Sequence, residues 1–412
     1  MLSKLSRQFR NWSTDASLIY SIVRRYQSDI FGASALELAA RSGDLAGCDL
    51  LLELGAPINL HGVRGQTALQ AASSEGELLM VQFLLDQGAD ATVPAYEDGG
   101  YTALQAAVLN GHERIAKCLL DAKADIRAPP AKRNGKTIVE AFAHYEDKTV
   151  SKFRKWLSQG APINRLDGDD GNVLHLLIED NTSSAHACLE IALQAGARIE
   201  DRDQFSRGQK TPLQVAAEVG DLDSVRLLLK YGANVNAFAG DDFGRTALQA
   251  AVCRQNFADL PAMVELLLSL GADVNAPPAR KGGITALQGA AISGDISMVK
   301  RLVELEADVN AAPAVEEGRT AIEGAAEHGR LDMVRFLISV GATGNPERGF
   351  DRAIELAVSE NHSLIADFLR DQQDLSAGFG MGMDDMFGGD FFSQVPCQGF
   401  VFSEENLGNF TF

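Results

Sequence analysis

The chain has 412 residues, 46% of them apolar and 23% charged, a composition typical of a soluble globular protein with room for several domains. Its formal net charge of −19 argues against direct nucleic-acid binding, because a phosphate backbone requires a basic face. No apolar run reaches the length of a membrane span, the five cysteines contain no CxxC pair, and the seven histidines contain no HExxH motif. We therefore expect no membrane segment, no metal site, and free thiols in a reducing, intracellular compartment.

Residues 1–33 are expected to form amphipathic helices that cap the body of the protein. The stretch MLSKLSRQFRNW places Leu2, Leu5, Phe9 and Trp12 at helical spacing among basic residues, and the first acid comes only after it. The same pattern is compatible with mitochondrial targeting, which stays open as an alternative. A secretory signal is excluded, because no continuous apolar segment follows the charges.

A repeated motif dominates residues 34–370. The hexapeptide TALQAA and its close variants begin at Thr67, Thr102, Thr211, Thr246, Thr285 and Thr320. Weaker copies begin at Ser34, Thr137, Asn172 and Arg352, so that successive starts lie 32 to 39 residues apart. A second signature of the type GADVN follows most starts about 25 residues later.

The copy at residues 211–236 shows why the motif predicts a pair of helices. Thr211 is a favourable N-cap, and Pro212 suits the first helical position. A short helix with a small-residue face then ends at Gly220, and a longer apolar helix ends at Gly232, since glycine accepts the left-handed conformation. Two such helices cannot bury their apolar faces alone, whereas stacked copies form a continuous core.

These motifs resemble the ankyrin repeat, whose pattern is T-P-L-H-x-A-A, then G-H, a leucine-rich second helix and G-A-D-V-N. About ten copies are similar to the ankyrin arrays of filamentous fungi. The resemblance implies an all-α solenoid of stacked helix pairs with finger loops, no cofactor and no catalytic site. The family histidine is glutamine in five copies and is kept only at His175; a glutamine can still bridge backbone groups of adjacent units.

The segment NGKT at residues 134–137 looks like the end of a phosphate-binding loop. Such a loop requires a glycine five residues before Gly135, and this position is Pro130. Thr137 instead aligns with the capping threonine of a repeat, so we exclude a nucleotide site here.

The finger loops between units carry the candidate partner-binding residues. In the family, these fingers and the first helices line the concave face that binds partners. Acidic and aromatic side chains occur at Tyr96, Glu97, Asp98, Tyr101, Asp169, Asp170, Asp241, Asp242, Phe243, Glu316 and Glu317. Two fingers are basic instead, at 132–133 and 280–281. The acids serve either solubility alone or recognition of a protein with a basic segment, and the second reading predicts binding that weakens with salt.

Residues 137–200 are the least regular part of the repeat region. The unit at Thr137 lacks the glycine between its helices, and the unit at Asn172 is longer than its neighbours. A poor unit weakens both of its interfaces in an array where only neighbours touch. We therefore predict an easily opened point here.

Residues 371–412 have a different character, with seven acids, no Lys or Arg, and eight of the chain's 20 phenylalanines. We expect this tail to be disordered, since it cannot bury a core of its own. Its candidate binding residues are Phe387, Phe391, Phe392, Phe400, Phe402, Phe410 and Phe412. The composition fits a solubilising tail, a segment that docks on the array, or a segment that binds other proteins.

The sequence thus favours a monomeric, non-enzymatic protein-binding scaffold in the cytoplasm, the nucleus or both. The more specific hypothesis is a regulatory adaptor that acts as a transcriptional coregulator. It would bind a DNA-bound partner through the array and recruit other proteins through the tail. The alternatives are a structural or inhibitory scaffold with a docked tail, a stand-alone receptor end of a signalling or defence protein, and an accessory subunit of an enzyme.

Overall fold

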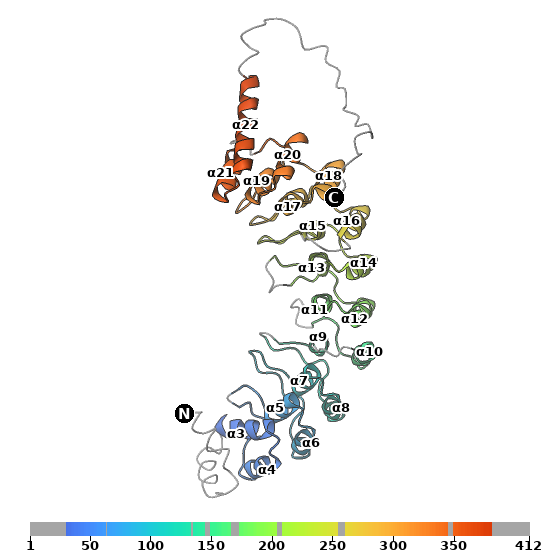
Figure 1. Ribbon diagram of the computed structural model, residues 1–412. Coiled ribbons are helices and arrows are strands. Elements are labelled where there is room, and N and C mark those ends of the chain that lie inside the picture. The colour runs from blue at the N-terminus through green and yellow to red at the C-terminus, as the bar shows by residue number, and fades with distance from the viewer. Residues whose placement is uncertain are drawn as a thin grey trace, which may run out of the picture. The chain divides into compact units, whose positions relative to one another are not determined.

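The computed structural model describes residues 30–62, 64–132, 135–144, 149–165, 173–203, 208–253, 260–344 and 349–380. These residues form twenty helices, α3 to α22, and no strand (Figure 1). The helices follow one another in pairs: α3 (Ile30–Arg41) and α4 (Leu45–Glu53), α5 (Ala68–Glu75) and α6 (Leu78–Asp86), α7 (Ala103–Leu109) and α8 (Glu113–Asp121), α9 (Ile138–Ala143) and α10 (Val150–Ser158), α11 (Val173–Asp180) and α12 (Ser183–Gln194), α13 (Pro212–Val219) and α14 (Leu222–Lys230), α15 (Ala247–Val252) and α16 (Leu260–Ser269), α17 (Ala286–Ser293) and α18 (Ile296–Glu304), α19 (Ala321–Glu327) and α20 (Leu331–Ser339), α21 (Asp351–Ser359) and α22 (Ser363–Gly380). The predicted all-α solenoid of helix pairs is confirmed.

The chain divides into two compact units, with the boundary between Ala321 and Ile322. In the first unit, the first helices of successive pairs pack on one another from α3 to α17, and the second helices form a separate layer beside them. The finger loops of this unit project on the side of the first helices (Figure 1). In the second unit, α22 packs against α20 and α21.

Most first helices begin directly after a repeat threonine, as predicted from its capping chemistry, whereas α3, α11 and α21 do not. Thr246 illustrates the pattern: its hydroxyl accepts the Gln249 N–H at 3.3 Å, and the Gln249 Oε1 accepts the Thr246 N–H at 2.9 Å. The same reciprocal capping box occurs at Thr67, Thr102, Thr137, Thr211 and Thr285. Two of the backbone N–H groups that a helix N-terminus leaves unpaired are satisfied in this way.

The core explains why the first helices are rich in alanine. Ala71 and Ala72 of α5 are completely buried, as are Ala216 of α13 and Ala290 of α17. Side chains this small allow neighbouring first helices to approach closely. The second helices fill the remaining volume with larger side chains such as Val81 and Leu84, so the apolar core runs continuously along the first unit.

The second signature, GADVN, links successive units through its asparagine. The Asn236 side chain accepts the Asp273 N–H at 2.8 Å and donates to the Gly271 carbonyl at 2.8 Å. Asn275 repeats both bonds one unit later, with the Asp308 N–H and the Glu306 carbonyl. The asparagine recurs because its side chain satisfies one carbonyl and one N–H just after the second helix of the next unit.

The structure moves two expected boundaries. Helix α3 begins at Ile30, so Ser34 lies inside a helix and does not cap one. Helix α22 continues to Gly380, so residues 371–380 are helical and the expected tail boundary at 371 falls within the helix. The Gln373 amide donates to the Asp351 carboxylate at 2.9 Å, which ties this extension to α21. Residues 1–29 and the candidate tail phenylalanines lie outside the described residues.

Candidate partner-binding surface

The longer fingers share one backbone turn, which sets the direction of their tips. Five fingers carry a glycine at Gly100, Gly135, Gly244, Gly283 or Gly318, where an added Cβ would lie 2.1–2.5 Å from a backbone atom of the residue four positions earlier. The residue before this glycine is left-handed at Gly99, Phe243, Gly282 and Glu317. The two sides of each finger therefore approach too closely for a side chain, and the charged residues of the tip lie at the turn.

Three neighbouring fingertips are joined by backbone hydrogen bonds. Asp242, Lys281 and Glu316 form isolated parallel β-bridges, in which the Lys281 N–H donates to the Asp241 carbonyl at 3.1 Å and the Glu316 N–H to the Arg280 carbonyl at 3.0 Å. The return bonds run from Phe243 to Lys281 and from Gly282 to Glu316, each at 2.9 Å. The fingers around residues 242, 281 and 316 are therefore one linked row, which we call the fingertip row.

Acidic and basic fingers alternate, and their charges pair within the array. Arg280 lies 3.2 Å from Glu316, and Lys281 lies 3.6 Å from Glu317. In another finger pair, Lys132 donates to Glu97 at 2.8 Å. These pairs are exposed, so each contributes little to the stability of the array. They matter more for recognition than for stability. Three of the predicted partner-binding acids, Glu97, Glu316 and Glu317, already face a cation of the same chain.

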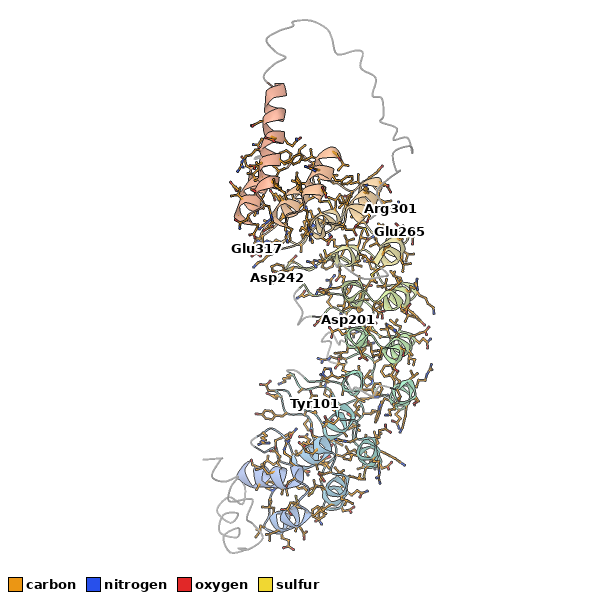
Figure 2. All side chains as sticks on the ribbon, viewed as in Figure 1. Tyr101, Asp201, Asp242, Glu265, Arg301 and Glu317 are labelled. Carbon is orange, nitrogen blue, oxygen red and sulfur yellow. The ribbon has the colours of Figure 1, made fainter. Side chains whose placement is uncertain are left out.

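Asp241 and Asp242 differ from the other predicted acids. Both carboxylates are exposed, and within the described ranges neither forms an ion pair. Phe243, on the same fingertip, packs its ring over Gly282, where an added Cβ would lie 2.1 Å from the ring. Figure 2 shows Asp242 and Glu317 on the finger side of the first unit, together with Tyr101 and Asp201.

The predicted aromatic residues of the second finger lie in two environments. Tyr96 is half exposed, packs its ring over Gly65 and lies 5.9 Å from the ring of His61 between centroids. Tyr101 is more buried, and burial raises the pKa of its hydroxyl. Asp98 is exposed. Asp169 and Asp170 lie outside the described residues, so their candidate role stays a prediction.

The sequence reasoning missed Phe238, the most exposed aromatic side chain among the finger residues that the structure describes. Its side chain is 72% exposed, and the guanidinium of Arg202 lies 4.0 Å from the ring centroid. Three other fingers carry proline at the equivalent position, at Pro94, Pro129 and Pro277. A phenylalanine in place of a repeat proline is the signal that could have found it.

The repeat glutamines fix the base of each finger, and the expected bridging role is confirmed. The Gln249 amide donates to the Ala276 carbonyl at 2.8 Å and to the Pro277 carbonyl at 3.2 Å, at the start of the next finger. Gln70, Gln105, Gln214 and Gln288 make the same two bonds in their units. The His175 Nε2 atom lies within hydrogen-bond distance of the Lys210 carbonyl, at 2.9 Å.

One unit of the irregular region replaces the glutamine with an ion pair. Glu140 stands at the glutamine position, and Arg165 of the next finger donates to it through Nε at 3.0 Å and Nη2 at 3.2 Å. Arg165 also donates to the Gly135 carbonyl at 2.8 Å. A carboxylate cannot donate to the finger carbonyls as the glutamine does; here the arginine donates to the carboxylate and neutralises a nearly buried charge.

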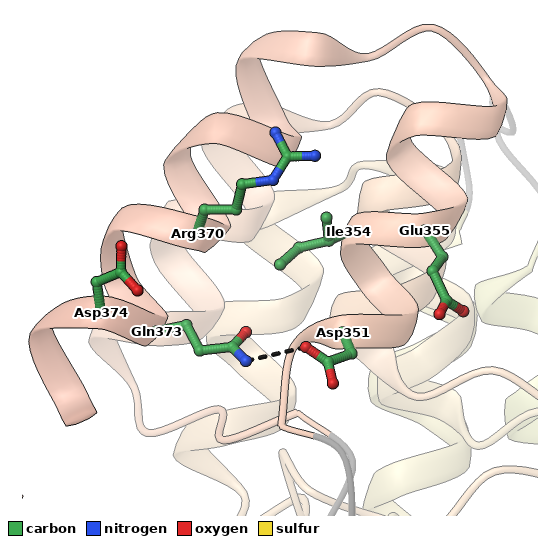
Figure 3. A pocket seen from close by; sticks show the side chains of 6 residues that line it. All are labelled: Asp351, Ile354, Glu355, Arg370, Gln373 and Asp374. Carbon is green, nitrogen blue, oxygen red and sulfur yellow. Dashed lines mark hydrogen bonds between the residues drawn. The ribbon is translucent and has the colours of Figure 1, made fainter.

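A shallow pocket of about 380 Å³ lies in the second unit between α21 and α22. Its lining is polar apart from Ile354, and it includes the carboxylates of Asp351, Glu355 and Asp374 beside Arg370 (Figure 3). This lining does not suit an apolar small molecule. Across the described ranges, no group of His, Cys, Asp or Glu side chains could hold a metal ion, and no helix is long and apolar enough to cross a membrane.

Stacked helix pairs with linked fingers define a repeat scaffold whose surface binds other proteins. The family model of ankyrin repeats matches residues 36–130, 131–239, 174–278, 237–313 and 260–348. The chain belongs to the ankyrin-repeat family, and its repeats form a protein–protein interaction module. It is also 39% identical over 69 residues to an ADP-ribosylation factor GTPase-activating protein of Arabidopsis thaliana. That match covers 17% of this chain and 8% of the relative, so the chain spans a small part of that protein's length.

Proposed function

We propose that the chain is a non-catalytic regulatory adaptor that binds a protein with a basic segment through its finger surface. The observation that carries this proposal is the fingertip row, in which backbone hydrogen bonds fix the positions of the tips around residues 242, 281 and 316. A surface whose parts are already ordered loses little entropy when a partner binds. The exposed Asp241 and Asp242 favour a partner of opposite charge.

The second half of the proposal concerns the residues after α22. Their acids and phenylalanines resemble the composition of amphipathic activation segments. The adaptor would then act as a transcriptional coregulator: the array binds a DNA-bound protein, and the C-terminal segment recruits others. In this reading the chain is monomeric and works in the nucleus as well as the cytoplasm.

A reporter experiment tests the recruiting role with the full-length chain. The chain is fused to an unrelated DNA-binding domain, and reporter output is compared with that of the double variant Phe391→Ala, Phe392→Ala. Leu364→Ala, which alters an exposed apolar side chain of α22, is the matched control. Activation that the double variant loses and the control keeps supports the coregulator. Equal output from all three fusions and from the DNA-binding domain alone refutes it.

The ion pairs between fingers favour one alternative, a purely structural scaffold. In that case the charges of the finger surface serve the cohesion of the array and not recognition. The two functions differ in what the C-terminal segment does. Residues 381–412 that resist proteolysis in the isolated protein would favour the scaffold with a docked tail, whereas rapid cleavage would favour the adaptor.

A further inference from the structure

Phe238 is held in a fixed orientation although most of its surface faces solvent. Arg202 stacks on one face of the ring, and its guanidinium is fixed in turn by donating to the Gln209 carbonyl at 2.7 Å and to the Phe238 carbonyl at 2.9 Å. The stacked cation is partly buried, and this burial lowers the pKa of Arg202. One face of the ring is thereby covered, and the other is open.

The backbone beneath Phe238 is equally constrained. The Gln214 amide donates to the carbonyls of Ala237 at 2.9 Å and Phe238 at 3.0 Å. Two residues later, an added Cβ at Gly240 would lie 2.1 Å from the Gly208 carbonyl oxygen, so the two fingers touch through their backbones. A large aromatic side chain on such a support loses little conformational freedom when a partner covers it, which is the usual property of an interface hot spot.

The charges beside the ring indicate the chemistry of the partner. Asp241 and Asp242 lie on the same finger, and the cation of the next fingertip, Lys281, pairs with Glu317. The finger therefore combines an open aromatic face with two carboxylates that form no ion pair among the described residues. In a chain of net charge −19, a basic partner is attracted to such a finger.

We propose that Phe238, backed by Arg202, anchors a binding site for a peptide segment that carries an apolar side chain next to a lysine or arginine. The apolar side chain packs on the open face of Phe238, and the basic one pairs with Asp241 and Asp242. This inference rests on the proposed adaptor function and adds the position of the site and the chemistry of the partner.

A displayed library of random peptides of about 12 residues, selected on the full-length protein, supplies the probe. We expect the selected peptides to contain Lys or Arg beside Leu, Phe or Trp. Their affinity should fall roughly tenfold or more for Phe238→Ala, since a few large aromatic anchors typically carry most of the binding energy of an interface. The variant Asp241→Asn, Asp242→Asn should weaken binding at low salt and flatten its salt dependence.

Leu79→Ala is the matched control, because Leu79 is an apolar side chain of the second helix α6 that is 69% exposed and is not part of a finger. It should leave the affinity within about twofold of wild type. Selected peptides that bind Phe238→Ala as tightly as wild type, but lose affinity for Tyr96→Ala, overturn this inference and leave the adaptor function standing. A selection that enriches no peptide overturns the inference and speaks against the finger surface as a peptide-binding site. Circular dichroism of each variant verifies that the fold is intact.

Discussion

Replacing Gln249 with alanine should destabilise the array by about 2–4 kcal/mol. The side chain is 1% exposed and makes three hydrogen bonds: it accepts the Thr246 N–H at 2.9 Å and donates to the Ala276 and Pro277 carbonyls. Each bond contributes roughly 1 kcal/mol net, and a buried N–H without an acceptor costs about 1–3 kcal/mol. The variant also leaves a cavity between two units, which adds to the loss.

Gln249→Glu distinguishes the accepting role of the Gln249 side chain from its donating role. The carboxylate can still accept the Thr246 N–H, but it now faces two carbonyl oxygens and is buried without a cation. It should therefore destabilise the array more than alanine does. Adding Ala276→Arg places a guanidinium where Arg165 stands relative to Glu140, directly after the asparagine of the signature. The double variant should recover part of the lost stability.

Urea unfolding of the full-length protein, followed by circular dichroism, measures these differences. Hydrogen exchange at α15 and α17 localises them, because an array of repeats can unfold in parts. Gln87→Ala, which changes an exposed glutamine at the end of α6, is the control. The reasoning fails if Gln249→Ala stays within about 0.5 kcal/mol of wild type. It also fails if Gln249→Glu is no worse than alanine.

Three further predictions concern the ends and the middle of the array. Arg165→Ala should cost about 3–5 kcal/mol, because it leaves Glu140 buried without its partner, and should cost more than Glu140→Gln in the same urea assay. Burial raises the pKa of the Glu37 carboxyl above its ordinary value of 4.5, and this effect outweighs the opposite effect of Arg41 and Arg64. The ionised carboxylate therefore lowers the stability of the protein at neutral pH. Glu37→Gln should therefore raise Tm at pH 7, and the gain should disappear as the pH falls below 4.5; a gain that persists in acid contradicts this. Hydrogen exchange should find residues 137–200 less protected than the units on either side, whereas uniform protection would refute the easily opened point.

The local features of the fold could be predicted because their determinants lie close together in sequence. A capping box joins residues three positions apart, such as Thr211 and Gln214, so the repeat threonine identified each helix start. The boundaries that were wrong lie where no such motif occurs. Helix α3 begins four residues before Ser34, and α22 continues beyond 371 through residues without apolar periodicity.

The finger contacts could not be read from the sequence, because they join residues about one repeat apart. Arg280 and Glu316 are 36 residues apart, and only the stacking of units brings them to 3.2 Å. In the sequence alone an acidic finger resembles a free acidic surface, because the cation that pairs with it lies on the neighbouring finger. The position of Phe238 in its finger could be read from the sequence, but the packing of Arg202 from the preceding finger on its ring could not.

The ion pairs between fingers also change what salt dependence can prove. Salt weakens the internal pair of Arg280 with Glu316 as well as any pair with a partner, so a salt effect alone does not identify an acidic recognition strip. Removing the internal cation is more informative. Arg280→Ala should unmask Glu316 and strengthen binding of a basic peptide about twofold to fivefold, in line with the worth of an exposed pair. The measurement is peptide titration at two salt concentrations, with Lys132→Ala on a distant finger as the control. Weaker binding by Arg280→Ala would mean that the basic finger itself contacts the partner, and that the fingertip row recognises a segment of mixed charge.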